Sequence, residues 1–588
     1  MKPSEQTEAS NESGVAAGEM ETPSPITDVE PQTPEKPRSV ARSAGIVSIA
    51  VMFSRVLGLV REMVFAAFFG AGFLYDAYLV GFRIPNLLRD LFAEGALSAA
   101  FVKVFTDYQI KKSEQEAWRL ASLVLNALVV TLSVVTIFGV IFSRQIVGLI
   151  ASGYSPEKAA LATTLTQIMF PFILLVAMAA LAMGVLNTKG KFGIPASAST
   201  AFNVVSLIFG LGFAYFLSGG GWQANQSDAN AVPEMAAQWA IIGMAVGTLI
   251  GGAAQFLIQI PSLFKVGFRF SPILSFTDPG VKRVAVLMAP AILGVSAVQV
   301  KVLIDTFMVS GIDGGQSWLS YSFRLMQFPI GVFGVAIGTA AIPTLSRFAA
   351  QEDFAAFRKT LSGAINLVFL LTLPSACGLI VLCEPIIRLI YERGKFDAAD
   401  TEMTAWALIG YSIGLTGYAA IKVLSPAFYA LDDAKTPMYI SVASIAVHFA
   451  TSYTMLNLLS QVAVSPEHPH GLAHVGVTLA TSTVATLNFI ALILIMRRRI
   501  DRIEGRAILS SFVRIAVASA LLSLVAYFSY RFLANSLGTE SLLARMIEVF
   551  VPIALGGAVF VTAAKLLGIH EMNQIYNGLM RKLGRGKK

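Results

Sequence analysis

Long uninterrupted runs of apolar residues, separated by short polar or turn-rich segments, occupy most of this chain. A run of about 20 residues is long enough to cross a hydrocarbon core of ~30 Å as a helix. Lipid offers the backbone no hydrogen-bonding partners, so runs of this length form helices. The pattern therefore predicts an all-α polytopic membrane protein with about fourteen transmembrane helices. The predicted spans are 44–70, 74–102, 120–142, 160–186, 194–218, 237–260, 284–310, 319–345, 361–383, 402–425, 437–459, 472–495, 508–533 and 543–567.

An internal repeat relates the first six predicted helices to the next six at an offset of about 241 residues. The span 120–142 falls on 361–383, and Pro195 falls on Pro437. Because six is an even number, both halves have the same orientation, with a pseudo-twofold axis along the membrane normal. We predict two pseudo-symmetric six-helix lobes, 43–270 and 271–500, around a central cavity. Two further helices occupy 501–570.

The distribution of basic residues predicts the orientation. Charged residues are 14% of the chain and hydrophobic residues 55%, whereas soluble domains are about 25% charged. The net charge of +8 comes from basic residues at helix ends, which indicates the positive-inside rule rather than nucleic-acid binding. The links 103–119, 187–193, 261–283, 346–360 and 496–507 are basic, and the links 71–73, 219–236, 311–318 and 460–471 are not. Both termini are thus predicted to be cytoplasmic, in a multi-pass protein of the bacterial inner membrane.

Three basic residues contradict this pattern, because Arg388, Arg393 and Lys395 lie on the predicted outer side. We interpret them as part of an interfacial amphipathic stretch.

The ends of the chain have a different composition from the spans. Residues 1–42 are rich in Pro, Glu, Ser and Thr, which predicts a disordered cytoplasmic tail without a cleaved signal peptide. Residues 571–588 form a basic cytoplasmic tail.

Charged residues inside the predicted spans are candidate functional positions, because each costs about 3 kcal/mol at the bilayer centre. Asp76, Arg83, Asp90 and Glu94 are spaced by 7, 7 and 4 residues and so share one helical face. Such a face is too polar for lipid and is expected to border the cavity. The predicted substrate-binding residues are Arg55, Arg61, Asp76, Arg83, Arg89, Glu94 and Arg324.

Both predicted lobes supply arginines, since the repeat offset places Arg324 opposite Arg83. An arginine stays charged, and its planar fork binds phosphate oxygens in pairs. The arrangement therefore favours an anionic substrate that carries phosphate. For Arg61, Glu62 and Asp76, which flank the first outer turn, an interfacial position is the alternative.

Other patterns indicate structural roles. Lys301 and Asp305 are four residues apart in one span and are predicted to neutralise each other as a structural or coupling pair. Gly243, Gly247 and Gly251 form a repeated G-x-x-x-G pattern, which is typical of close helix packing. The segment 184–192 departs from a nucleotide-binding P-loop in its spacing and lacks the final Ser or Thr. We predict no cofactor, and transport driven by the membrane potential or an ion gradient.

Several segments resemble the MurJ/MviN lipid II flippase family, over roughly residues 44–570. They are Phe53-Ser54-Arg55-Val56-Leu57-Gly58, Pro85-Asn86-Leu87-Leu88-Arg89 and Arg324-Leu325-Met326-Gln327-Phe328-Pro329. The resemblance implies the fold of the multidrug/oligosaccharidyl-lipid/polysaccharide exporter superfamily. It also implies a substrate, lipid II, which is a disaccharide-pentapeptide on undecaprenyl diphosphate. The family moves lipid II to the outer leaflet for peptidoglycan synthesis, by alternating access.

The resemblance also implies residue roles. The family's cavity arginines match Arg55, Arg61, Arg89 and Arg324, and its first-lobe aspartate matches Asp76. Its two extra helices, which correspond to 508–567, form a groove for the lipid tail. Some relatives bind sodium, which would make Asp305 one ligand, although His448 and Ser452 replace the expected oxygen ligands on the eleventh helix.

Three alternative functions have different requirements. A flippase for another prenyl-diphosphate-linked glycan would use the same arginines. A cation-coupled drug exporter would need an acidic cavity. A membrane-embedded polymerase or glycosyltransferase would need a carboxylate or metal cluster at the membrane surface, and the longest outer links lack one. We therefore predict a monomeric transporter rather than an enzyme, with lipid II, the bilayer and the cell-wall synthesis machinery as partners, and not nucleic acid.

Overall fold

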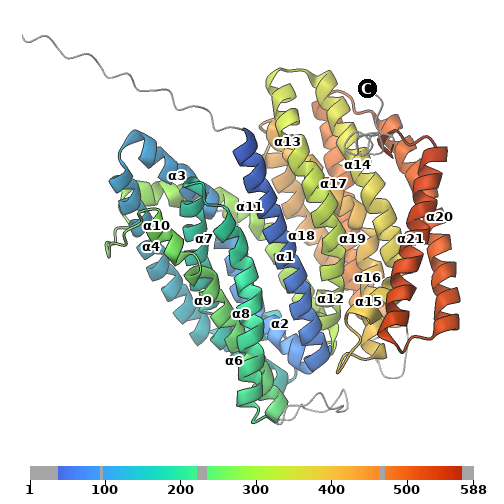
Figure 1. Cartoon of the computed structure of the whole chain (residues 1–588), viewed down its shortest axis with the longest axis horizontal. Coiled ribbons are helices and arrows are strands. Elements are labelled where there is room, and N and C mark those ends of the chain that lie inside the picture. Colours follow the sequence, from blue (N-terminus) through green and yellow to red (C-terminus); the bar gives the residue numbers. More distant parts are fainter. Residues whose placement is uncertain (1–36, 93–96, 221–234, 463–470, 573–588) are drawn as a thin grey trace, which may run out of the picture. The chain divides into compact units, whose positions relative to one another are not determined.

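A computed structural model describes residues 37–92, 97–220, 235–462 and 471–572 (Figure 1). The regular elements within these ranges are helices. The N-lobe helices are α1 (Pro37–Phe69), α2 (Phe73–Phe92), α3 (Ser98–Lys111), α4 (Glu114–Ile141), α5 (Ser143–Ile150), α6 (Pro156–Met169), α7 (Phe172–Thr188), α8 (Gly193–Leu217), α9 (Met235–Leu257) and α10 (Ile260–Lys265). Helix α1 begins at Pro37, so the last residues of the predicted disordered tail are helical. Residues 1–36 and 573–588 of the two predicted tails lie outside the described residues.

The described elements of the second half of the chain are also helices. The C-lobe helices are α11 (Pro279–Val309), α12 (Gly315–Pro329), the π-helical turn η2 (Ile330–Gly334), α13 (Val335–Ala350), α14 (Phe354–Val381), α15 (Cys383–Ile390), α16 (Ala398–Ile413), α17 (Leu415–Ala430), α18 (Lys435–Leu459) and α19 (Ala473–Arg499). The last two helices are α20 (Gly505–Leu537) and α21 (Leu542–Leu566). The predicted all-α polytopic fold is confirmed.

Ten helical segments in the described residues are long and apolar enough to cross a membrane, or eleven if α16 and α17, which are bent by 42°, form one span. With that pair included, they coincide with eleven of the fourteen predicted spans. The other three predictions, 44–70, 74–102 and 284–310, correspond to α1, to α2 with α3, and to α11. These helices carry most of the charged residues predicted to be functional. The count of fourteen remains a prediction.

Helix lengths support the internal repeat. Helices α4 and α14 both have 28 residues, and they start at Glu114 and Phe354. The short helices α5 and α15 both have 8 residues and follow α4 and α14 directly. Helices α8 and α18 both have 25 residues, and they start at Gly193 and Lys435. The offset predicted from the sequence is therefore found in the order and length of the helices.

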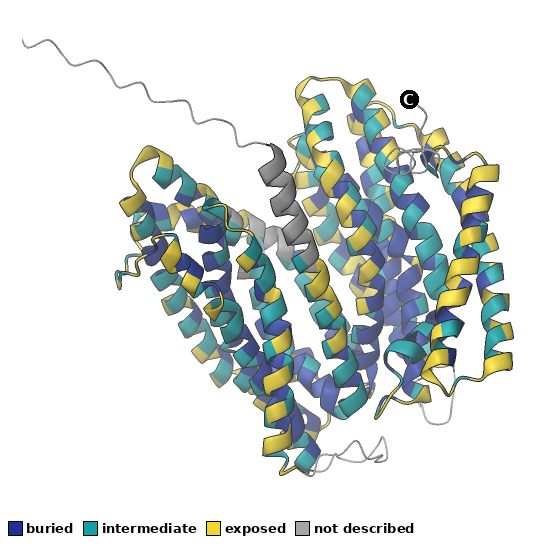
Figure 2. Ribbon diagram, in the orientation of Figure 1, coloured by how far each residue is buried: buried dark blue, intermediate teal, exposed yellow. Residues whose placement is uncertain are grey.

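Most helix contacts fall within the predicted lobes. Helix α8 packs on α9 and α2 on α6, while α18 packs on α19 and α12 on α16. Helix α11 contacts helices of both lobes, among them α3 and α18. Helices α20 and α21 lie side by side, with α20 against α14 (Figure 1). Their exposed faces are apolar, as Phe528 and Phe550 illustrate, and this surface suits lipid (Figure 2).

The G-x-x-x-G pattern lies where α9 meets α8. A Cβ atom added at Gly247 would overlap the backbone of Gly210 and lie 2.7 Å from the Ser206 carbonyl oxygen. We expect Gly247→Ala to destabilise the protein by about 1–3 kcal/mol, because the two backbones would have to separate. Gly212→Ala on α8 is the matched control, since open space surrounds that position. Thermal melting in detergent measures both variants, and equal melting temperatures would contradict the prediction.

Candidate functional site

The two lobes meet through a buried aspartate at their predicted outer ends. Asp76, in the first turn of α2, is fully buried. Its carboxylate accepts hydrogen bonds from the Ser317 backbone N–H at 2.8 Å, the Ser317 hydroxyl at 2.6 Å and the Gly314 N–H at 2.9 Å. Gly314 has a φ of 81°, a conformation that glycine adopts without strain. An N-lobe carboxylate therefore caps the positive N-terminal end of C-lobe helix α12.

A lysine completes this connection. Lys158, near the start of α6, is buried, and its Nζ lies 2.8 Å from Asp76 Oδ2 and 2.6 Å from Asp313 Oδ1. The C-lobe provides an equivalent carboxylate: Asp400 Oδ1 accepts from Trp318 Nε1 at 3.0 Å, and its Oδ2 accepts from the N-lobe Ala71 N–H at 3.1 Å. Both pairs, Asp76 with Lys158 and Trp318 with Asp400, are separated by 82 residues. We call these residues, with Gly314 and Ser317, the inter-lobe contact.

Aromatic side chains lie next to the inter-lobe contact. The rings of Tyr75 and Tyr321 stack with centroids 5.0 Å apart, and Tyr391 lies 4.8 Å from Tyr321. The Tyr321 hydroxyl donates to the Gly70 carbonyl at 3.1 Å. All three rings are buried. This aromatic layer therefore joins the two lobes through apolar contact.

Glu62 links the aromatic layer to the arginines. Its buried carboxylate accepts a hydrogen bond from the Tyr75 hydroxyl at 2.5 Å and one from Arg324 Nη2 at 2.6 Å. Arg61 Nη2 approaches the same carboxylate at 3.5 Å. Two arginines, one from each lobe, therefore share a single carboxylate, and a positive charge remains.

The donors of these arginines are only partly used. The Arg324 side chain is 42% exposed despite its ion pair. Arg61 packs over the Phe202 ring, and its buried Nε and Nη1 have no hydrogen-bond partner among the described residues. Arg55 is exposed and lies against the backbone of η2, where a Cβ atom at Gly331 would overlap its guanidinium. Buried N–H groups in proteins are normally hydrogen-bonded, so these donors are available to a polar ligand or to water.

Arg83 and Asp90 connect α2 to the C-lobe, and Asp90 also holds Arg89. Arg83 Nη2 donates to Gln316 Oε1 on α12 at 3.1 Å. Arg89 donates twice to Asp90 Oδ1, at 2.7 and 3.1 Å, and Asp90 Oδ2 accepts from Gln299 on α11 at 3.0 Å. These two arginines are therefore held by polar groups at the lobe boundary.

Comparison with known proteins identifies the family. The model of the lipid II flippase MurJ family matches residues 65–548. A lipid II flippase MurJ of Burkholderia cenocepacia is 36% identical over 460 residues, which are 77% of this chain and 83% of that protein. A probable lipid II flippase MurJ of Vibrio cholerae is 35% identical over 461 residues, 77% of this chain and 82% of that one. The chain belongs to the lipid II flippase MurJ family.

Solved structures agree with membership in the MurJ family. A structure described as lipid II flippase MurJ in an inward closed conformation matches with a TM-score of 0.69 and 27% identity, over 89% of this chain and 99% of that one. An inward-facing MATE family multidrug resistance transporter of the MOP superfamily matches with a TM-score of 0.61 and 14% identity, over 78% of this chain and 98% of that one, which shows a shared fold. The family is one of transporters, which confirms the prediction that the chain is not an enzyme.

For this MurJ-family protein, the structure groups some of the predicted site residues. It places Arg61 and Arg324 at one carboxylate, Arg55 against η2, and Arg83 and Arg89 at the lobe boundary. Asp76 lies instead in the inter-lobe contact, where its oxygens are occupied by protein donors. Glu94 lies outside the described residues. Whether these residues bind substrate remains a prediction.

Asp305 contacts a histidine and not the predicted Lys301. Lys301 and Asp305, both described, form no ion pair with each other; Asp305 Oδ1 instead lies 2.6 Å from His448 Nε2 on α18. His448 is buried, and its Nδ1 and the Ser452 hydroxyl have no partner among the described residues. A sodium ion prefers several oxygen ligands, and here a ring nitrogen occupies the carboxylate. Asp305 is therefore engaged by a histidine, and a sodium site at this carboxylate remains a prediction.

Sequence analysis missed the partners of Asp76. Lys158 lies just after the Ser155-Pro156 start of α6. A basic residue on the predicted outer side is unusual, and this could have indicated that Lys158 has an acidic partner. The repeat offset of about 241 residues places Asp400 close to the position in the second lobe that corresponds to Lys158. Of the basic outer residues, Arg388 lies on the amphipathic helix α15, which buries Ile387 and pairs Arg388 with Glu384, whereas Arg393 and Lys395 follow the end of α15. The position of α15 at the membrane interface remains a prediction.

Proposed function

We propose that this chain flips lipid II from the inner to the outer leaflet of the bacterial cytoplasmic membrane by alternating access. The observation that carries this proposal is the pair Arg61 and Arg324, one from each lobe, which share the single carboxylate of Glu62 beside the inter-lobe contact. A diphosphate offers paired oxygens to guanidinium groups and would supply the missing acceptors. Membership in the MurJ family supports the choice of lipid II.

Glu62 provides a way to couple substrate binding to opening. A diphosphate that binds Arg324 competes with the Glu62 carboxylate for the same donors. Glu62 also holds the Tyr75 hydroxyl, and Tyr75 stacks on Tyr321 of the other lobe. Release of Glu62 therefore weakens the aromatic layer between the lobes. The sugar-peptide head group would cross between the lobes while the prenyl chain stays in lipid, in the groove predicted at 508–567.

Both termini are proposed to be cytoplasmic, with the inter-lobe contact near the periplasmic face. Tags at the two ends should be protected from membrane-impermeant reagents added to intact cells. Labels in the links 219–236 and 460–471 should react. Reaction of either terminal tag from outside would reverse the orientation and place the inter-lobe contact at the inner face.

The proposed transport also needs an energy source and a cellular setting. Movement of a charged head group across the membrane is driven by the membrane potential or an ion gradient, without a cofactor. The protein works as a monomer beside the cell-wall synthesis machinery. A flippase for another prenyl-diphosphate glycan is the alternative that uses the same arginines, whereas a cation-coupled drug exporter is disfavoured by their positive charge.

Complementation distinguishes these alternatives. The gene should restore growth and lipid II flipping when the resident lipid II flippase of a host bacterium is depleted. It should not restore surface glycan in a host that lacks its O-antigen flippase. An empty vector and the resident flippase gene serve as the two controls. Failure in the first host with rescue in the second would replace lipid II by another prenyl-diphosphate glycan.

A further inference from the structure

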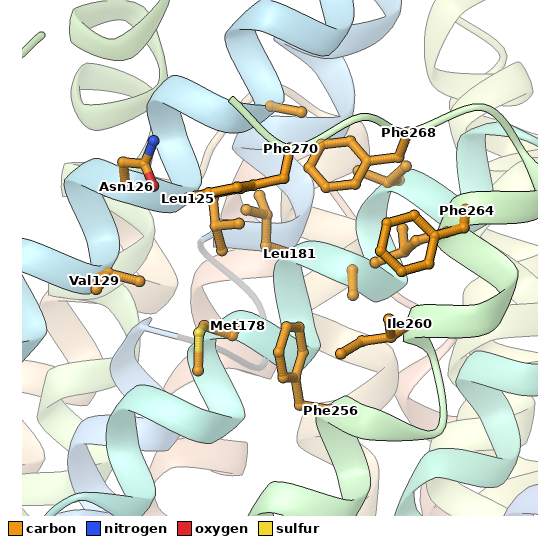
Figure 3. Close-up of a pocket in the computed structure, with 14 residues that line it drawn as sticks. Leu125, Asn126, Val129, Met178, Leu181, Phe256, Ile260, Phe264, Phe268 and Phe270 are labelled. Carbon is orange, nitrogen blue, oxygen red and sulfur yellow. The ribbon is translucent and has the colours of Figure 1, made fainter. Parts of the chain in front are cut away.

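The N-lobe contains an apolar pocket that the proposed transport mechanism does not use (Figure 3). Its volume is about 340 Å³, and it lies between α4, α7 and the segment from α9 to residue 270. Figure 3 shows the rings of Phe256, Phe264 and Phe268 on one side and Leu125 and Val129 on the other. The pocket is within the ~300–1,000 Å³ range of small-molecule sites.

The walls of the pocket are apolar apart from one side chain. Asn126 is the one polar side chain among the lining residues, and its Nδ2 donates to the carbonyls of Ser271 at 2.9 Å and Ile273 at 2.7 Å. These bonds also fix the chain that leads from α10 to α11. A buried water needs about two to four polar partners, and this lining supplies a single polar side chain whose amide N–H groups are already bonded. The chemistry of the pocket fits a hydrocarbon chain.

The depth of the pocket matches one leaflet of the bilayer. Ala121 lies about two turns and Val129 about four turns after the start of α4, and Val185 lies close to the end of α7. At ~1.5 Å per residue these lining residues therefore lie from about 5 Å to about 20 Å from the helix ends. Half of a ~30 Å hydrocarbon core has a similar thickness. Phe264 and Phe270, at 62% and 53% exposure, are the exposed aromatic residues of its lining.

Basic residues flank the lining aromatics. Lys265 follows Phe264, and Arg269 stands between Phe268 and Phe270. Both are exposed, and neither forms an ion pair with another described residue. Basic residues at the membrane surface attract anionic lipid head groups. The apolar pocket therefore suits an acyl chain of an anionic phospholipid, and Lys265 and Arg269 suit its phosphate.

We propose that this pocket binds one acyl chain of an anionic phospholipid from the leaflet beside the 261–283 link, with its phosphate at Lys265 and Arg269. This leaflet is the inner one in the proposed orientation. The lipid contacts the segment that connects the lobes, so its occupancy stabilises the position of that link. The site is separate from the arginines of the proposed substrate site and from α20 and α21.

Native mass spectrometry of the full-length protein in detergent tests the proposal, with phosphatidylglycerol and phosphatidylcholine as probes. The wild-type protein should retain one phosphatidylglycerol, in preference to phosphatidylcholine by about tenfold. Ala182→Phe should fill the pocket and lose this lipid. Ser199→Phe, which adds the same side chain on the exposed face of α8, is the matched control and should keep it.

A surface variant covers the case in which Ala182→Phe does not fold. Lys265→Ala with Arg269→Ala leaves the apolar walls unchanged and should remove the preference for phosphatidylglycerol. Equal retention by wild type and Ala182→Phe, or an unchanged preference in the double variant, would overturn the site. Undecaprenyl diphosphate that displaces phosphatidylglycerol at equal concentration would overturn the phospholipid assignment and indicate a substrate subsite instead. None of these outcomes depends on whether the proposed lipid II transport is correct.

Discussion

Replacing Arg324 with Ala should abolish lipid II flipping, and replacing it with Lys should restore little of it. The side chain of Arg324 is 42% exposed and shares the Glu62 carboxylate with Arg61, so it can reach a ligand while it remains paired with Glu62. A lysine keeps the charge but has no planar fork, so it cannot bind two phosphate oxygens in parallel. Flipping in spheroplasts or proteoliposomes, normalised to protein abundance, measures the effect.

The partner of Arg324 requires a second variant. Arg324→Ala leaves the buried Glu62 carboxylate with only the Tyr75 hydroxyl and a distant Arg61. Breaking a fully buried ion pair costs about 3–5 kcal/mol, and the exposure of Arg324 reduces this cost through solvent screening. We expect a modest loss of abundance in Arg324→Ala. The double variant with Glu62→Gln should recover abundance without recovering flipping.

The double variant also decides between two roles. If Arg324 only neutralises Glu62, removal of both charges should restore flipping to a level near that of wild type. If Arg324 binds the substrate diphosphate, flipping should stay absent although the protein is folded and present. Recovery of flipping in the double variant would end the assignment of Arg324 to the substrate site.

Asp76→Ala should open the inter-lobe contact and stop alternating access. The substitution removes three hydrogen bonds to the start of α12 and one ion pair, and it leaves Lys158 buried with Asp313 alone. The loss of about 3 kcal/mol from a buried pair changes the balance between closed and open states by roughly a hundredfold. Flipping should fall because the transporter no longer closes at its outer end.

Cysteine accessibility measures this opening. Ala151→Cys, in a protein whose Cys377 and Cys383 are replaced by Ala, places a thiol in a buried position at the same end of the lobes. An impermeant maleimide added outside should label it at least about tenfold faster with Asp76→Ala. Glu114→Ala is the control, because Glu114 forms its ion pair with Lys189 within the N-lobe. Equal labelling in the two variants would show that Asp76 does not hold the lobes together.

Local patterns in the sequence were sufficient for the helices and their repeat. The length of an apolar run depends only on neighbouring residues, so the positions of α4, α8 and α14 followed from it. The repeat offset emerged in the same way, because equivalent helices keep their lengths in both lobes. The charged residues of α1 and α2 stood out because lipid excludes them. The sequence therefore determined the class of fold and which residues needed a polar environment.

Only the tertiary structure decided which partners these residues have. Lys301 and Asp305 are four residues apart, yet Asp305 contacts His448, which is 143 residues away, because α18 packs against α11. Asp76 meets Ser317 across 241 residues. A charged side chain of a transmembrane helix binds the polar group that packing brings within hydrogen-bond distance, and helix periodicity indicates a face but not its neighbour. The apolar pocket has the same origin, since α4, α7 and the segment after α9 enclose it only when they are packed together.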